Sequence, residues 1–183
     1  MDTNNQPEIE DMSAEYKKQL IKYLFLCALS EGSKILLFTM IFLRFHLLNE
    51  FLFALILLIL LRTNGGGLHF KHYTSCFVVS FLVFLGSILL GIEYPISNSI
   101  STIILLASIG LGYRCVPVTS DNRPPATAKL LHKSKRNTTV ILITYMILVC
   151  MIPMNRYLSI GVWIIIIHIC QLILAKKIKR RKK

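Results

Sequence analysis

The stretch CFVVSFLVFLGSILLGI, residues 76–92, decides the fold class of this chain. It contains no charged side chain and approaches the ~20 residues that an α-helix needs to cross the hydrocarbon core of a bilayer. With 54% hydrophobic residues and a mean hydropathy of +0.61, the chain has more apolar surface than a water-soluble domain can bury. Further apolar runs lie at 35–45, 47–61, 98–113, 139–152 and 158–175. The sequence therefore predicts an all-α, polytopic membrane helical bundle, formed by a single domain over residues 1–183.

The N-terminal segment differs from these runs because it is amphipathic. Within residues 8–30, apolar side chains recur three or four positions apart, and Lys17, Lys18 and Lys22 occupy other faces. This pattern predicts a helix that lies in the membrane interface. A soluble helix packed on the rest of the protein would show nearly the same pattern, so both interpretations stay open at this point.

The distribution of charge predicts the topology. Residues 34–62 form either one bent span or two short helices. With two short helices the chain has about six spans and both termini in the cytoplasm, and of its 21 Lys and Arg only Arg44 and Arg156 fall outside. This arrangement fits the positive-inside rule better than a single bent span does. The loops 62–72 and 114–137 then both lie in the cytoplasm.

The net charge of +12 and the basic tail KKIKRRKK, residues 176–183, raise the question of a polyanionic partner. In a membrane chain, basic loops and tails face the cytoplasm and contact anionic lipid headgroups. We therefore expect membrane lipids, and not nucleic acid, to be the partner of these charges.

The polar stretch RTNGGGLHFKHYTSC, residues 62–76, is a candidate catalytic loop because it interrupts two runs of hydrocarbon. Cys76 stands where the loop gives way to the apolar run, and Lys71 lies nearby. Helix N-termini and neighbouring positive charge both favour the thiolate form of a cysteine, which is the nucleophilic form. The sequence thus makes Cys76 a candidate nucleophile.

Two histidines are candidates for the base that a nucleophilic cysteine needs. His72 is four residues before Cys76, so on one helix the two share a face. His69 is seven residues before Cys76, roughly 10.5 Å away along a straight helix, which is too far for direct proton transfer. The glycines at 65–67 permit a fold-back that would bring His69 closer. Spacing alone leaves both histidines open.

Simpler interpretations compete with a catalytic one. Cys76 can be an inert thiol, the glycines an ordinary turn, and Arg62 a snorkelling anchor at the end of an apolar run. His69, His72 and Cys76 lack a fourth ligand nearby, which makes a weak metal site. We therefore expect no metal and no cofactor. The five cysteines include no CxxC pair, so we also expect no disulfide framework.

The loop resembles the accessory gene regulator B (AgrB) family of bacterial quorum sensing. The family pattern has an arginine, then Gly-Gly-x-His, then a cysteine seven residues after the histidine, and here Arg62, Gly66-Gly67-Leu68-His69 and Cys76 match it. A second family feature, Pro-Val followed by Asn-Arg-Pro, is matched by PVTSDNRPP in the later polar loop. Size, amphipathic start and basic tail also fit, so the resemblance covers nearly the whole chain.

The resemblance implies a membrane cysteine endopeptidase with Cys76 as nucleophile and His69, rather than the runner-up His72, as base. It assigns supporting or substrate-binding roles to Arg62 and Gly67. It also implies a pro-peptide substrate (AgrD-like), a thioester acyl-enzyme, and cyclisation to a thiolactone or lactone signal. Finally, the resemblance implies a homodimer in the bacterial cell membrane, with its active site on the cytoplasmic side.

A third catalytic residue and two rival functions stay open. Residues 62–76 contain no carboxylate, so within the loop only Asn64 could orient the imidazole, while Glu31 or Glu50 could approach in three dimensions. The rivals are a small peptide exporter or transporter and a non-catalytic membrane scaffold. His168 is the only ionisable group deep in an apolar run, which argues against ion-coupled transport.

Overall fold

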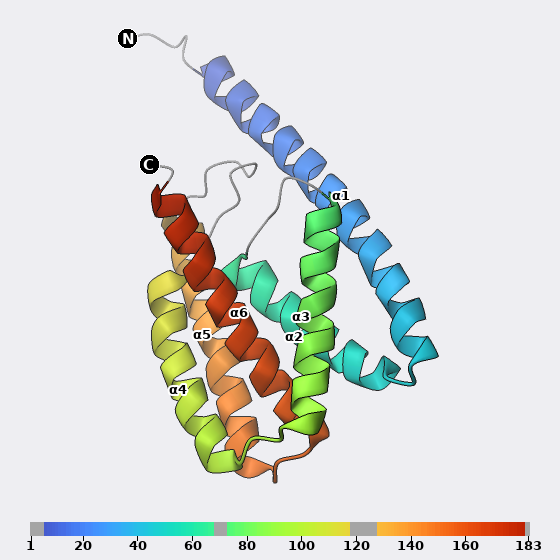
Figure 1. The fold of residues 1–183 in the computed structure, drawn as a ribbon. Coiled ribbons are helices and arrows are strands. Elements are labelled where there is room, and N and C mark those ends of the chain that lie inside the picture. The colour runs from blue at the N-terminus through green and yellow to red at the C-terminus, as the bar shows by residue number, and fades with distance from the viewer. Residues whose placement is uncertain (1–5, 68–72, 118–127, 182–183) are drawn as a thin grey trace.

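The computed structural model describes residues 6–67, 73–117 and 128–181, and these form six α-helices (Figure 1). The described helices confirm the predicted all-α class. Their bounds are α1 Gln6–Arg44, α2 Leu48–Gly65, α3 Tyr73–Glu93, α4 Asn98–Cys115, α5 Ala128–Met151 and α6 Arg156–Arg181.

Helix α1 joins two segments that the sequence pattern treats as separate. The amphipathic residues 8–30 and the apolar run as far as residue 44 belong to one helix of 39 residues. A reversal then separates α1 from α2, with His46 at a φ of 57° and Leu47 N–H donating to Phe42 O. The structure thus divides residues 34–62 into two helices, as the charge distribution favours.

Three of the described helices are long and apolar enough to cross a membrane. They are Leu48–Gly65, Tyr73–Glu93 and Arg156–Ile178. This result supports the prediction of a membrane protein, and the total of six crossings stays a prediction. Helix α6 is the central helix, because 67% of its apolar window is buried against only 33% for α3.

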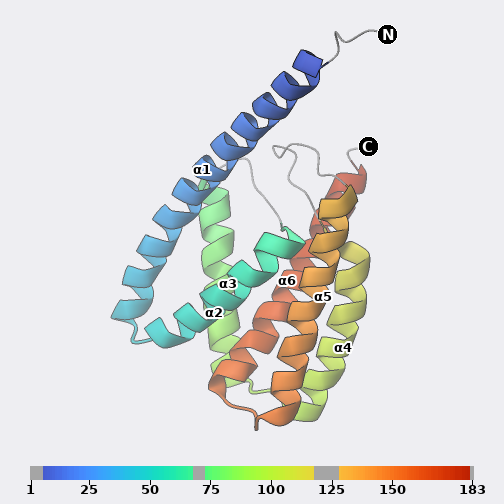
Figure 2. The same ribbon diagram turned by 180° about the vertical axis from the view of Figure 1, so that it is seen from behind.

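The helix ends fall into two groups (Figure 1, Figure 2). The N-terminal ends of α3 and α5 and the C-terminal ends of α4 and α6 lie at one end of the bundle, which we call the loop end. The connections α3–α4 and α5–α6 lie at the opposite end, and α1 projects past the loop end. Of the two basic residues predicted outside, Arg156 begins α6 at this opposite end, and Arg44 ends α1 at the α1–α2 turn, away from the loop end.

An aromatic cluster fixes α1 and α2 against α3. Phe38 of α1 packs on Phe77 of α3 with ring centroids 4.9 Å apart, and Phe42 stacks on Phe51 of α2 at 4.8 Å. The cluster is completed by Phe81 and Phe84 of α3. Because large aromatic side chains contribute much buried area and prefer defined geometries, this packing sets the position of α1 beside the start of α3.

Candidate active site

Cys76 lies in the first turn of α3, which begins at Tyr73. Its side chain is buried, with 8% of its surface exposed. Backbone N–H groups in the first turn of a helix have no intrahelical partner and present positive partial charge. The thiol is therefore held in a place that is both shielded from water and favourable for negative charge.

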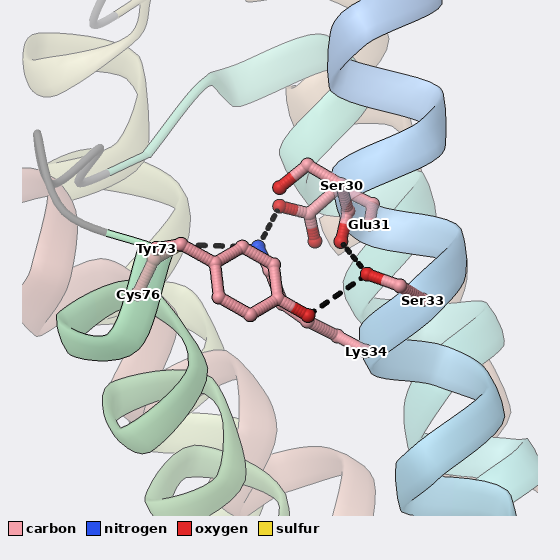
Figure 3. A network of polar contacts seen from close by, with 6 residues as sticks. All are labelled: Ser30, Glu31, Ser33, Lys34, Tyr73 and Cys76. Carbon is pink, nitrogen blue, oxygen red and sulfur yellow. Dashed lines mark hydrogen bonds and ion pairs between the residues drawn. The ribbon is translucent and has the colours of Figure 1, made fainter.

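A charged side chain from a distant part of the sequence contacts Cys76. Lys34 of α1 directs its ammonium group at the sulfur, with Nζ donating to Sγ at 3.3 Å (Figure 3). The same Nζ also donates to Glu31 Oε1 at 2.5 Å. Lys34 is only 2% exposed, whereas the side chain of Glu31 is 41% exposed. A buried ammonium thus links the sulfur to a carboxylate that keeps contact with solvent.

Two further contacts fix this arrangement. Tyr73 and Ser33 share a hydrogen bond between their hydroxyl oxygens at 2.8 Å, which ties α1 to the first residue of α3 (Figure 3). The Lys34 Nζ also lies over the Tyr73 ring, 5.6 Å from its centroid, within the range of a cation–π contact. The start of α3 and the middle of α1 therefore form one connected polar site.

Lys34 remains charged in this setting. Burial pulls the pKa of Lys34 down, but the contacts with Glu31 and Cys76 outweigh burial, and the pKa lies above its usual value. Lys34 precedes the apolar run 35–45 and lies outside the three helices that meet the criteria for spanning. At neutral pH it is accordingly a proton-bearing cation and not a base.

The structure separates the three side chains proposed as a third catalytic member. Glu31 reaches the site through Lys34. Glu50 is buried and pairs with Arg156 at 3.1 Å, at the opposite end of the bundle. Asn64 is engaged elsewhere, because its Oδ1 accepts from Asn137 at 3.0 Å and its Nδ2 donates to a backbone carbonyl.

Arg62 and Gly67 lie against each other at the end of α2. A Cβ added at Gly67 would stand 3.7 Å from Arg62 Nε and 3.9 Å from its Cγ, so the glycine backbone covers the arginine side chain. Within the described residues, the buried Arg62 Nε has no hydrogen-bond partner. This donor is available to a ligand or to another part of the chain, and the substrate-binding role predicted for Arg62 stays a prediction.

The end of α2 rests on a buried polar layer. A Cβ at Gly65 would lie 3.4 Å from His168 Nε2, 3.5 Å from Val116 and 3.6 Å from Thr138 Oγ1. Ser134 donates to the Asn64 carbonyl in the same region. Since these residues come from α5, α6 and the end of α4, the structure brings the borders of the two polar loops together.

Both candidate bases lie outside the described residues. His69 and His72 fall within 68–72, and the Asn-Arg-Pro of the second family feature falls within 118–127. The choice between the two histidines therefore stays a prediction. Among the described residues, no group of His, Cys, Asp and Glu is arranged to hold a metal ion, and Cys76, Cys115, Cys150 and Cys170 are free thiols.

Lys34 is the site residue that sequence reasoning missed. It precedes Cys76 by 42 positions and reads as one more basic residue on a helix. One signal was available: Lys34 shares its helix face with Phe38 and Phe42, at four-residue spacing. A lysine that continues an apolar face needs a partner, and the sequence alone does not indicate which one.

Comparison with known proteins identifies the family. The family model described as Accessory gene regulator B matches residues 3–174. An AgrB-like protein of Clostridium beijerinckii is 29% identical over 128 residues, which make up 67% of this chain and 64% of that relative. The match thus spans just under two thirds of the relative's length. No solved structure matches the chain significantly. Since the family model covers nearly the whole of this helical chain, the protein belongs to the accessory gene regulator B (AgrB) family.

Proposed function

We propose that this protein is a membrane cysteine endopeptidase that removes the C-terminal tail of a quorum-sensing pro-peptide and promotes cyclisation of the remaining segment. Family membership supports a role in the agr quorum-sensing system. The observation that carries the proposal is the buried Cys76 thiol in the first turn of α3, with a charged ammonium 3.3 Å from its sulfur. An inert structural cysteine has no need of such a partner.

The first half of the proposed reaction is cleavage. His69 takes the thiol proton of Cys76, and the thiolate attacks the carbonyl carbon at the end of the signal segment. The C–N bond then breaks, and the imidazolium returns its proton to the leaving amine of the tail. The products are a free C-terminal tail and a thioester between the signal segment and Cys76. Backbone N–H groups near the start of α3 are available to stabilise the oxyanion.

The second half is ring closure. A cysteine thiol or serine hydroxyl within the signal segment attacks the thioester carbonyl, and the Cys76 thiolate leaves. The proton of the attacking group passes through His69 back to the sulfur, so the enzyme returns to its starting state. The thioester preserves acyl-transfer potential that hydrolysis would waste, and the burial of Cys76 limits access of water to it.

The charge distribution suits a peptide with an acidic tail. Basic residues occur where helices reach the loop end, in the last turn of α4, the first part of α5 and the last part of α6: Arg114, Lys133, Lys135, Arg136, Lys176 and Lys177. Such a field attracts acidic peptides and anionic lipid alike. We propose that the loop end lies at the cytoplasmic face of a bacterial cell membrane and that the protein acts as a homodimer. Arg62 and Gly67 would be supporting residues of the site.

Co-expression with a candidate precursor tests the proposal. The precursor is a short peptide with an amphipathic leader, an internal Cys or Ser, and an acidic C-terminal segment. We expect the tail to be released by the parent protein and not by Cys76→Ser, with both found at equal levels in the membrane. Cys170→Ser is the matched control, because Cys170 is an exposed thiol of α6.

The same assay separates the rival functions. A peptide exporter would move intact precursor without cleavage, and a scaffold would leave it intact in the membrane. Release of the tail by the Cys76→Ser variant, at the rate of the parent, would refute the cysteine endopeptidase.

A further inference from the structure

The burial of Lys34 needs a reason. Its side chain is 2% exposed and continues the apolar face formed by Phe38 and Phe42, where a leucine or methionine would pack without a charge to desolvate. Burying a paired charge is often neutral or unfavourable compared with burying an apolar residue of similar volume. An ion pair with Glu31 alone does not require burial, because Glu31 is itself partly exposed. Within the described residues, the second hydrogen-bond partner of the buried ammonium is the Cys76 sulfur.

We infer that Lys34 is a third catalytic residue, whose ammonium group holds the Cys76 sulfur as a thiolate for acyl transfer. The inference rests on the proposed cysteine endopeptidase and adds α1 to its active site. The geometry is direct, since Nζ lies 3.3 Å from Sγ and both side chains are buried. Charges in such surroundings are screened much less than charges at the surface.

Glu31 supports this role without competing for it. Its carboxylate lies 2.5 Å from Nζ and favours the protonated form of the ammonium group. The carboxylate itself is partly exposed to solvent. The two acceptors occupy separate protons of one ammonium group, which has three to donate. Lys34 therefore bears its proton throughout the reaction, and the transfer of protons to and from the substrate is left to the histidine.

The ammonium also acts in both halves of the reaction. During cleavage it stabilises the thiolate that forms when the thiol proton leaves. During ring closure the C–S bond of the thioester breaks, and the electron pair returns to the sulfur beside the same cation. A better-stabilised thiolate is a better leaving group. Lys34 thus favours release of the ring over persistence of the acyl-enzyme.

The contacts around Lys34 show how α1 is held for this task. Ser33 and Tyr73 bond the two helices on one side of it, and Phe38 packs on Phe77 one turn further along. Each contact joins a neighbour of Lys34 to a neighbour of Cys76. Helix α1 is therefore a structural part of the site.

The pH dependence of thiol alkylation tests the inference without any peptide. In the full-length protein with the other four cysteines replaced by serine, the rate of Cys76 modification by iodoacetamide is measured from pH 5 to 10. For Lys34→Met we expect the midpoint of the profile to rise by roughly one pH unit, with the rate at neutral pH falling about tenfold. Lys22→Met is the control, because it removes an equal charge from an exposed position on the same helix.

The plateau rate at high pH reports whether Cys76 remains equally accessible, so a folding defect is distinguished from a change in ionisation. Lys34→Gln, which keeps a hydrogen-bond donor without the charge, should shift the midpoint like Lys34→Met. Profiles of both variants that superimpose on the parent would overturn the inference while leaving the endopeptidase intact. Tail release by Cys76→Ser would instead refute the proposed function, and the alkylation result would stand independently.

Discussion

Cys76 has two histidines upstream in the same loop, and they differ in what they require of the backbone. His72 would reach the sulfur along one helical turn, whereas His69 reaches it only if residues between them depart from a straight helix. Helix α2 ends at Gly65 and α3 begins at Tyr73, and the residues that decide between the two histidines, 68–72, lie outside the described part of the chain. The choice of His69 therefore rests on the family pattern and stays a prediction.

Substitution of each histidine by glutamine tests the assignment. We expect His69→Gln to lower the rate of tail release by about 10²–10⁴-fold, because general acid–base catalysis typically contributes that much. His72→Gln should leave the rate near that of the parent. The measurement is single-turnover cleavage of the precursor in membranes, at matched protein levels. A larger loss from His72→Gln than from His69→Gln would reverse the assignment.

Only some residues of the candidate site could be predicted from the sequence. The position of Cys76 at a helix start could be predicted, because a polar loop gives way there to an uninterrupted apolar run. The Lys34 contact could not, since it depends on how α1 packs against α3 across 42 residues of chain. Nothing in the sequence favoured Glu31 over Glu50 as a residue near Cys76. The structure shows that Glu50 instead pairs with Arg156.

The arrangement of helices depends on close approaches that small residues allow. A Cβ at Gly91 of α3 would lie 2.7 Å from Ile160 Cα and 2.8 Å from Ile160 N of α6. A Cβ at Gly86 of the same helix would instead meet nothing within 4 Å. The contact between α3 and the central helix therefore requires glycine at one of these positions and not at the other.

Alanine substitutions at these two glycines form a matched pair. Gly91→Ala forces two backbones apart, and overpacking of this kind costs about 1–3 kcal/mol, occasionally more. Gly86→Ala should be neutral or stabilising by up to about 1 kcal/mol, because alanine is the better helix former. Thermal unfolding in detergent gives the comparison. A Gly91→Ala variant as stable as Gly86→Ala would contradict the packing of α3 on α6.

Helix existence was easier to predict than helix extent. The apolar runs at 76–92 and 158–175 lie within α3 and α6, because length and hydrophobicity suffice to indicate them. The continuity of α1 could not be read from periodicity, since its amphipathic half and apolar half show different patterns. Only Gly32 lies between those halves as a weak helix former, and one such residue costs about 1 kcal/mol, too little to end a helix of this length.

The whole molecule concentrates its chemistry and its basic charge at one end. Cys76 lies in the first turn of α3 and Arg62 in the last turn of α2, and Lys34 joins Cys76 from the middle of α1. The C-terminal ends of α4 and α6 carry basic residues at the loop end, whereas α6 begins with Arg156 at the opposite end. This polarity agrees with the topology that the positive-inside rule predicts. The number of crossings depends on helices such as α4 and α5, whose apolar windows are interrupted by polar residues.

Cysteine accessibility in intact cells tests the predicted orientation. In a background without native cysteines, Ser97→Cys marks the α3–α4 connection and Lys133→Cys marks the first part of α5, and both positions are exposed. A membrane-impermeant maleimide should label the first from outside and the second only after permeabilisation. The reverse pattern would place the catalytic loop on the outer face and would exclude a cytoplasmic site.

The central claim, that Cys76 forms a covalent acyl-enzyme, is tested most directly by trapping that species. A precursor whose internal Cys or Ser is replaced by alanine cannot close the ring, so the thioester should accumulate on the purified protein. After acid quenching and digestion, mass spectrometry should find the signal segment, without its tail, attached to the peptide that contains Cys76, and hydroxylamine should release it. Tail release with no adduct on Cys76, or an adduct on another residue, would contradict the account.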